Sequence, residues 1–144
     1  MLVRDFVQTD LIRIHSDANL FEAAEQMFAH RVETLLVYRD DQFLGVIGLR
    51  DLFTAPIPAH YGNAMQHHTD ETQLLNIWKT TTVRNLMNEK VLTVNEDAAL
   101  LRALELMVNT GKHLLPVMRD GKVVGIISRM DIVRALLEQS KSAA

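Results

Sequence analysis

The apolar and polar positions of the first 54 residues predict five elements in the order strand, helix, strand, strand, helix. Strands are predicted at 11–14, 34–38 and 43–47, and the last helix begins at about Arg50. The first helix is predicted from one apolar stripe with the spacing i, i+3, i+4, i+7, i+8, formed by Leu20, Ala23, Ala24, Met27 and Phe28. We expect the whole stripe, including Phe28, to pack in the core. Asp17 stands where the N-cap of this helix is expected.

The same pattern returns at a constant offset of 80 residues, with no gap. Residues 3–54 and 83–134 share 15 identities in 52 aligned pairs, whereas unrelated segments of this composition would share roughly 3 or 4. The second copy predicts strands at 91–94, 114–118 and 123–127, an N-cap at Asp97, and a last helix over 129–139. Because a three-stranded sheet cannot bury both faces alone, we expect the two copies to share a core about a pseudo-twofold axis.

The repeat divides the chain into a first copy (1–54), a linker (55–82), a second copy (83–139) and a tail (140–144). Pro56 and Pro58 are expected to end the last helix of the first copy, and 61–63 reads as a loop. Leu74, Leu75 and Trp78 predict a short linker helix over about 71–79. Its apolar face, with the single tryptophan, is expected to pack rather than to form a site.

Composition excludes several classes of function. The net charge is −3 with interspersed signs, so no basic stripe favours nucleic acid. The absence of cysteine excludes disulfides and fits a reducing cytoplasm, and no apolar run indicates a signal peptide or a membrane span. No nucleophile–base motif is readable, so we expect a cytoplasmic protein that is not an enzyme.

The order of elements, with Gly125–Asp131 and Leu114–Val117, resembles the cystathionine-β-synthase (CBS) domain family. Two tandem copies resemble a CBS pair, or Bateman module, over about three quarters of the chain. The resemblance implies an α/β (α+β) fold of two βαββα repeats. It also implies a regulatory module that needs no cofactor but binds AMP, ADP, ATP or S-adenosylmethionine in clefts between the copies. Such modules commonly form homodimers, and the signal would pass to a partner protein by a conformational change.

The resemblance also implies a ligand motif, a hydroxyl residue three positions before an aspartate, which Ser128 and Asp131 match. An ionised Asp131 can accept hydrogen bonds from both ribose hydroxyls, and Ser128 can donate to a phosphate beside a helix N-terminus. Arg129 could meet a phosphate charge. The residues that the resemblance assigns to the adenine slot are Thr93, Val94, His113, Leu114 and Leu115, and Pro116 beside them is also expected in the site.

Ser-x-x-Asp is also a capping-box pattern, so Ser128 and Asp131 could serve only to start a helix. The first copy keeps Asp51 beside Arg50 but has Gly48 in place of Ser128. Glu33, in place of His113, would repel phosphate. If one site dominates, we expect it at Asp131.

Two other groups of polar residues stand out in the sequence. His60, His67, His68, Asp70 and Glu71 gather in the linker but lack a fixed ligand spacing, so a polar loop is favoured over a metal site. Arg4 and Arg84 open the two copies, and Arg50 and Arg129 open their last helices. They are either solvated charges or a ring of guanidinium groups that neutralises phosphates.

Overall fold

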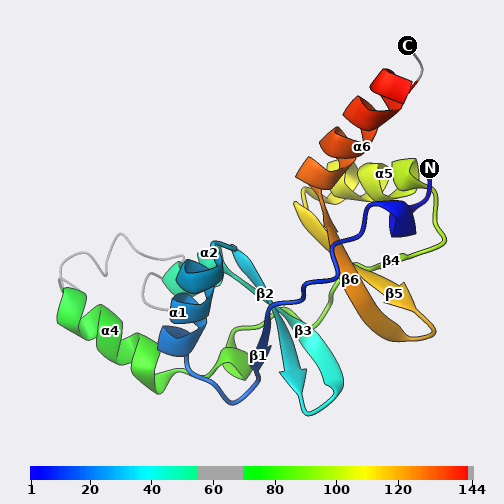
Figure 1. Ribbon diagram of the computed structural model, residues 1–144. Helices are drawn as coiled ribbons and strands as arrows, with labels where there is room; N and C mark the ends of the chain where they lie inside the picture. Colours follow the sequence, from blue (N-terminus) through cyan, green and yellow to red (C-terminus); the bar gives the residue numbers. More distant parts are fainter. Residues whose placement is uncertain (55–69, 143–144) are drawn as a thin grey trace. The chain divides into compact units, whose positions relative to one another are not determined.

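The computed structural model describes residues 1–54 and 70–142, which form two compact α+β units (Figure 1). Unit 2 comprises Ile12–Val91, and unit 1 combines Met1–Leu11 with Leu92–Ala144. Each unit has its own three-stranded sheet and its own hydrophobic core. The expected mixed α and β fold, in two copies of one pattern, is therefore confirmed. Instead of one shared core there are two, and each takes residues from both copies, such as Val3 in unit 1 and Val83 in unit 2. The predicted Pro56, Pro58 and 61–63 features lie outside the described residues.

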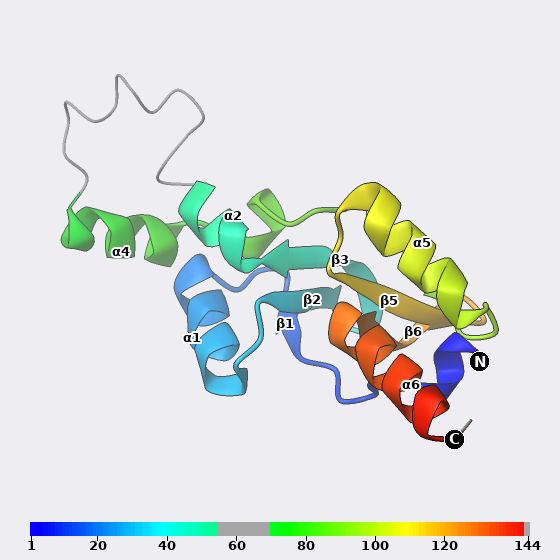
Figure 2. The same cartoon turned by 90° about the horizontal axis from the view of Figure 1, so that it is seen from above.

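Unit 2 follows the predicted order. Its elements are β1 (Arg13–His15), α1 (Leu20–His30), β2 (Thr34–Arg39), β3 (Gln42–Gly48), α2 (Leu49–Thr54), α4 (Glu71–Thr80) and a short 3-10 helix, η3 (Val83–Asn85). Strand β1 is parallel to β2, and β2 is antiparallel to β3. Helix α4 confirms the predicted linker helix and lies against α1 (Figures 1 and 2).

Unit 1 repeats the arrangement. Its elements are the 3-10 helix η1 (Val3–Asp5), β4 (Val94–Asn95), α5 (Leu100–Thr110), β5 (Leu114–Arg119), β6 (Lys122–Ser128) and α6 (Arg129–Ser142). The β5–β6 hairpin turns at Asp120 and Gly121, which have φ angles of 51° and 78°. Positive φ at both positions is what a tight two-residue hairpin requires, so the Asp-Gly signal is confirmed.

Each unit is completed by the leading segment of the other repeat. In unit 1, Gln8 pairs with Ile126 through N–H to O=C bonds of 2.8 and 2.9 Å. In unit 2, Asn88 pairs with Val46 in the same way, at 2.8 and 3.1 Å. A Cβ on Gly125 would collide with the Gln8 carbonyl oxygen. A Cβ on Gly45 would collide in the same way with the Asn88 carbonyl oxygen. Both repeats therefore keep glycine where the leading segment of the other repeat touches β3 or β6.

The predicted helix caps are wrong. Helix α1 is capped by Asn19, whose side chain accepts from the backbone N–H of Glu22 at 2.8 Å. Helix α5 has Ala99 at its N-cap and no side-chain cap. The chain makes one more turn after each strand before the helix begins, so Asp17 and Asp97 lie too early and their carboxylates bond arginines instead.

The predicted burial of Phe28 is also wrong, because its side chain is 87% exposed. Leu20, Ala23 and Met27 are buried as expected. An α-helix advances about 100° per residue, so the eighth position after Leu20 lies about 100° away from the centre of the buried face. Val108, the equivalent residue of α5, is 72% exposed for the same reason.

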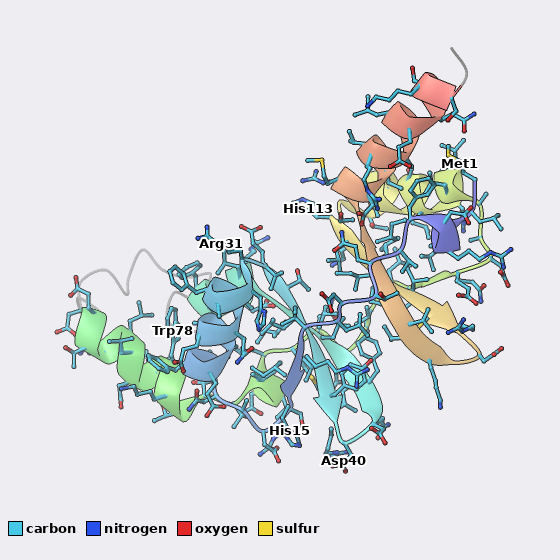
Figure 3. The ribbon with its side chains drawn as sticks, in the orientation of Figure 1. Met1, His15, Arg31, Asp40, Trp78 and His113 are labelled. Carbon is cyan, nitrogen blue, oxygen red and sulfur yellow. The ribbon has the colours of Figure 1, made fainter. Side chains whose placement is uncertain are left out.

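Trp78 packs as expected. Its ring contacts the core of unit 2 and lies 6.3 Å from the ring of Phe53, centroid to centroid (Figure 3). Its Nε1 donates a hydrogen bond of 2.8 Å to the carbonyl of Leu52. One aromatic side chain therefore ties α4 to α2 by packing and by a hydrogen bond.

Candidate functional site

The centre of the candidate site in unit 1 is the carboxylate of Asp131, in the first turn of α6. Its side chain is only 5% exposed. Oδ2 accepts from the backbone N–H of Ser128 at 2.8 Å and from the Ser128 hydroxyl at 3.0 Å. The backbone N–H of Asp131 lies 3.4 Å from Ser128 Oγ. These reciprocal contacts form the capping box that the sequence left open as an alternative.

Further donors surround the same carboxylate. Arg134 Nη2 lies 3.4 Å from Oδ1, and it is equally close to the carbonyl oxygen of Phe6. The side-chain amide of Gln8 lies within hydrogen-bond distance of both carboxylate oxygens. The buried negative charge is thus stabilised by one cation and by several neutral donors.

The start of β5 lies next to this helix N-terminus. Leu114 is the register partner of Ser128, and the backbone N–H of Arg129 donates to the carbonyl of His113 at 3.1 Å. His113, labelled in Figure 3, is exposed, as is Arg129. Four of the predicted site residues in unit 1 besides Asp131 are therefore brought together at one end of the sheet.

The remaining predicted site residues lie deeper in unit 1. Val94 is 5% exposed and belongs to the hydrophobic core, and Pro116 is fully buried. Thr93 is half-buried directly before β4. Val94 pairs with Val117 in the middle of β5, so its side chain supports the sheet. These positions can offer backbone groups and apolar walls rather than charged contacts.

Unit 2 holds a reduced version of the arrangement. The Asp51 carboxylate accepts from the backbone N–H of Gly48 at 2.8 Å, the only bond to this carboxylate among the described residues. The backbone N–H of Leu49 donates to the Glu33 carbonyl at 2.8 Å, as Arg129 does to His113. Arg50 is exposed. The two helix starts therefore share a backbone but differ in the donors around the carboxylate.

Sequence reasoning missed Gln8 and Arg134. Gln8 precedes Asp131 by 123 residues, and its alignment partner in the repeat is Asn88, so neither motif nor identity marked it. The only sequence signal for this contact was that both repeats have glycine at the aligned positions 45 and 125. A glycine within a strand indicates that another backbone approaches closely. Arg134 was hidden because the first copy has Thr54 at that position.

The arginines that open the copies do not join this site. The backbone N–H of Arg4 donates to the Glu96 carbonyl, and its side chain pairs with Asp97. Both acidic residues follow β4, which is parallel to β5, so they lie at the sheet end opposite to Leu114 and Ser128. Arg84 makes the equivalent pair with Asp17 in unit 2. Arg4 therefore lies away from Asp131 within unit 1, and Arg84 lies away from Asp51 within unit 2.

Two negative observations concern the part of the chain that the structure describes. Over 1–54 and 70–142, no three His, Asp or Glu side chains are grouped to hold a metal ion. Asp70 instead caps α4, by accepting from Gln73 N–H at 2.9 Å. His60, His67 and His68 lie outside the described residues. No described helix is long and apolar enough to cross a membrane.

A fold of two βαββα repeats, each with an aspartate in the first turn of its last helix, is that of a tandem CBS module. The model of the CBS domain family matches residues 3–57 and 83–138. The chain therefore belongs to the CBS domain family, and the resemblance seen in the sequence is confirmed.

Individual relatives agree with this assignment. The chain is 28% identical over 138 residues to an uncharacterised 17.7 kDa protein of Acidianus ambivalens. This alignment covers 94% of this chain and 73% of that protein. The first curated relatives are matched over only 14% to 73% of their own length.

Solved structures share the fold. Protein MJ1225 of Methanocaldococcus jannaschii matches with a TM-score of 0.80 and 22% identity, over 94% of this chain and 47% of that one. The CBS domain pair of protein MJ0100, in complex with methylthioadenosine and S-adenosyl-L-methionine, matches with a TM-score of 0.70 and 23% identity. That alignment covers 96% of this chain and 98% of the other.

Proposed function

We propose that this CBS module is a regulatory sensor that binds an adenine nucleotide (AMP, ADP or ATP) at the Asp131 end of unit 1. Asp131 would accept the ribose hydroxyls, and Ser128 with the first turn of α6 would meet the phosphates, aided by Arg129. The strand starts at His113 and Leu114 would flank the adenine. Such a module would act without catalysis.

The observation that supports this most is the burial of Asp131. It is the one buried carboxylate in the described part of the chain. Capping alone does not require burial, because Asp70 caps α4 from an exposed position. A charge withdrawn from water costs free energy unless it is paired, and such groups concentrate at binding sites.

Nucleotide occupancy would reach a separate effector protein through a change of conformation. A ligand can shift such an equilibrium only by its differential affinity for the two states. Regulation by this chain therefore requires that nucleotide bind one state more tightly. The effector is a protein partner that would contact the module in only one of those states.

The test is a thermal-shift panel with AMP, ADP, ATP and S-adenosylmethionine, each at about 100 times its dissociation constant. At that ratio one bound ligand adds about 2.7 kcal/mol, which raises the melting temperature by about 5–10 °C in a protein of this size. S-adenosylmethionine belongs in the panel because protein MJ0100 carries it. A response to that ligand alone would replace the nucleotide in this proposal.

The site is tested by Asp131→Asn with Asp51→Asn as the matched control. Loss of charge-assisted bonds to ribose costs about 1.5–3 kcal/mol, so Asp131→Asn should weaken nucleotide binding about ten- to hundredfold. Asp51→Asn should have a smaller effect. Equal effects, or none at Asp131, would contradict a dominant site in unit 1.

A second candidate function is a ligand-free dimerisation scaffold, which exposed apolar side chains favour. Met130, Val133, Leu136 and Leu137 are all more than 40% exposed on α6. Their spacing of three and four residues forms a stripe suited to a second copy of the chain. If no ligand of the panel shifts the melting temperature, and Leu137→Lys converts a dimer into a monomer in sedimentation, the scaffold function would be preferred.

A further inference from the structure

Gln8 holds the Asp131 carboxylate in the manner expected of a ligand. Its Nε2 lies 2.8 Å from Oδ1 and 3.0 Å from Oδ2, so one amide group bridges both oxygens. The nitrogen must face the carboxylate, since the amide oxygen would be repelled there. Gln8 is exposed, whereas the Asp131 side chain beneath it is 5% exposed. The amide therefore lies on the solvent side of a buried charge.

The acceptor capacity of Asp131 is full in this arrangement. Two carboxylate oxygens offer about four acceptor positions. Ser128 donates twice to Oδ2, and Arg134 approaches Oδ1 at 3.4 Å. The bridging amide of Gln8 adds a second contact at Oδ1 and a third at Oδ2, so no acceptor position is left on either oxygen. A pair of ribose hydroxyls, which needs one position on each oxygen, could bind only after the amide has left Oδ1 and the Ser128 hydroxyl has turned from Oδ2 to the phosphate.

We propose that Gln8 is an affinity-determining residue that competes with the ribose of the nucleotide for Asp131. This inference rests on the proposed function and adds an internal competitor to it. The Gln8 backbone stays paired with Ile126, so only its side chain has to rotate away. Because the free state already satisfies the buried carboxylate, the nucleotide gains only the difference between the two sets of hydrogen bonds. Gln8 therefore keeps affinity low and adds a neutral donor to the buried carboxylate when the site is empty.

The chain contains its own comparison at Asn88. Its backbone bridges Val46 as Gln8 bridges Ile126. Its shorter side chain turns back, and its Oδ1 accepts from the N–H of Lys90 at 3.0 Å. Asp51, the equivalent of Asp131, receives no bond from it. The same backbone position thus carries a competitor in unit 1 but not in unit 2.

The experiment compares Gln8→Met with Asn88→Leu, which replaces the matching residue of unit 2. Methionine keeps the length of glutamine but cannot donate a hydrogen bond. Calorimetric titration with AMP and with ATP should show binding about tenfold tighter in Gln8→Met than in the unaltered chain. Asn88→Leu should bind like the unaltered chain. Equal or weaker binding by Gln8→Met would overturn the competitor while leaving the proposed function intact.

A second measurement uses the unaltered protein and does not depend on how a variant folds. The side-chain NH2 resonances of Gln8 should shift on addition of AMP, as the amide leaves the carboxylate, whereas those of Asn88 should not. AMP binding without any shift at Gln8 would overturn the inference. If neither AMP nor ATP binds the unaltered chain or Gln8→Met, the proposed function itself fails.

Discussion

Arg4 Nη1 donates a 2.6 Å hydrogen bond to Oδ1 of Asp97, and Arg84 makes the corresponding ion pair with Asp17. Both pairs join the beginning of one repeat to the turn after the first strand of the other. Arg4 and Asp97 lie in unit 1, and Arg84 and Asp17 lie in unit 2. Since both arginines and both aspartates are identical between the repeats, the duplication preserved the same ion pair in each unit.

This geometry predicts a small structural role for Arg4. The side chains of Arg4 and Asp97 are 53% and 66% exposed, so solvent screens the pair and its coupling should not exceed about 1 kcal/mol. A double-mutant cycle of Arg4→Ala and Asp97→Ala in urea unfolding measures it, and added salt should reduce it. Arg4→Ala should leave nucleotide affinity unchanged. A large loss of nucleotide affinity in Arg4→Ala would instead indicate that Arg4 contacts the phosphates.

The repeat glycines yield a sharper prediction. Gly125→Ala would place a methyl group against the Gln8 carbonyl and the Val7 side chain, so the leading segment must move away from β6. We expect a loss of about 1–3 kcal/mol in the free energy of unfolding. Gly48→Ala is the matched control, because its Cβ would lie 3.6 Å from the nearest atom, the Glu33 carbonyl oxygen. Equal losses in the two variants, measured by urea unfolding, would contradict the close approach.

Periodicity predicted the elements well because burial acts on each one locally. The stripe of α1, the Asp120–Gly121 turn and the linker helix all follow from interactions within one element. The predicted N-caps were wrong because the position of an N-cap depends on how many residues the preceding turn contains. In the structure this turn is bonded to the leading segment of the other repeat, by Val83 N–H to the Ala18 carbonyl and by Arg84 N–H to the Ser16 carbonyl. Spacing within one repeat does not reveal such contacts.

Only part of the candidate site could be predicted, for a related reason. Ser128 and Asp131 are close in sequence, and the resemblance to CBS domains marked them. Gln8 comes from the other end of the chain and reaches Asp131 only because its segment packs in unit 1. A contact over 123 residues leaves no periodic signal in a single sequence. The bond from Gln8 to Asp131 could therefore be recognised only in the structure.

Because the Tyr38 phenol is buried, we expect the protein to lose stability at high pH. The tyrosine side chain is buried on β2, and burial raises the pKa of the phenol, partly opposed by the Arg13 guanidinium 4.2 Å from the ring centroid. Above the usual tyrosine pKa of about 10, the unfolded chain releases this proton before the folded chain does. The stabilisation is complete below that value and declines as pH rises through it toward the folded pKa. Urea unfolding between about pH 9 and about pH 11 should show the decline, reduced in Tyr38→Phe.

Gly48→Ser would give unit 2 the hydroxyl that Ser128 supplies in unit 1. A Cβ at position 48 would be 3.7 Å from Asp51 Oδ2, so the new hydroxyl can donate to this carboxylate without displacing backbone. Serine in place of glycine at a helix N-cap adds a few tenths of a kcal/mol, measurable as a small rise in the unfolding midpoint. Because Asn88 does not occupy Asp51, we also expect nucleotide affinity in unit 2 to rise, detected as a second binding event in calorimetry. A stabilised variant with one binding event would show that capping, not ligand, is the role of the hydroxyl in this repeat.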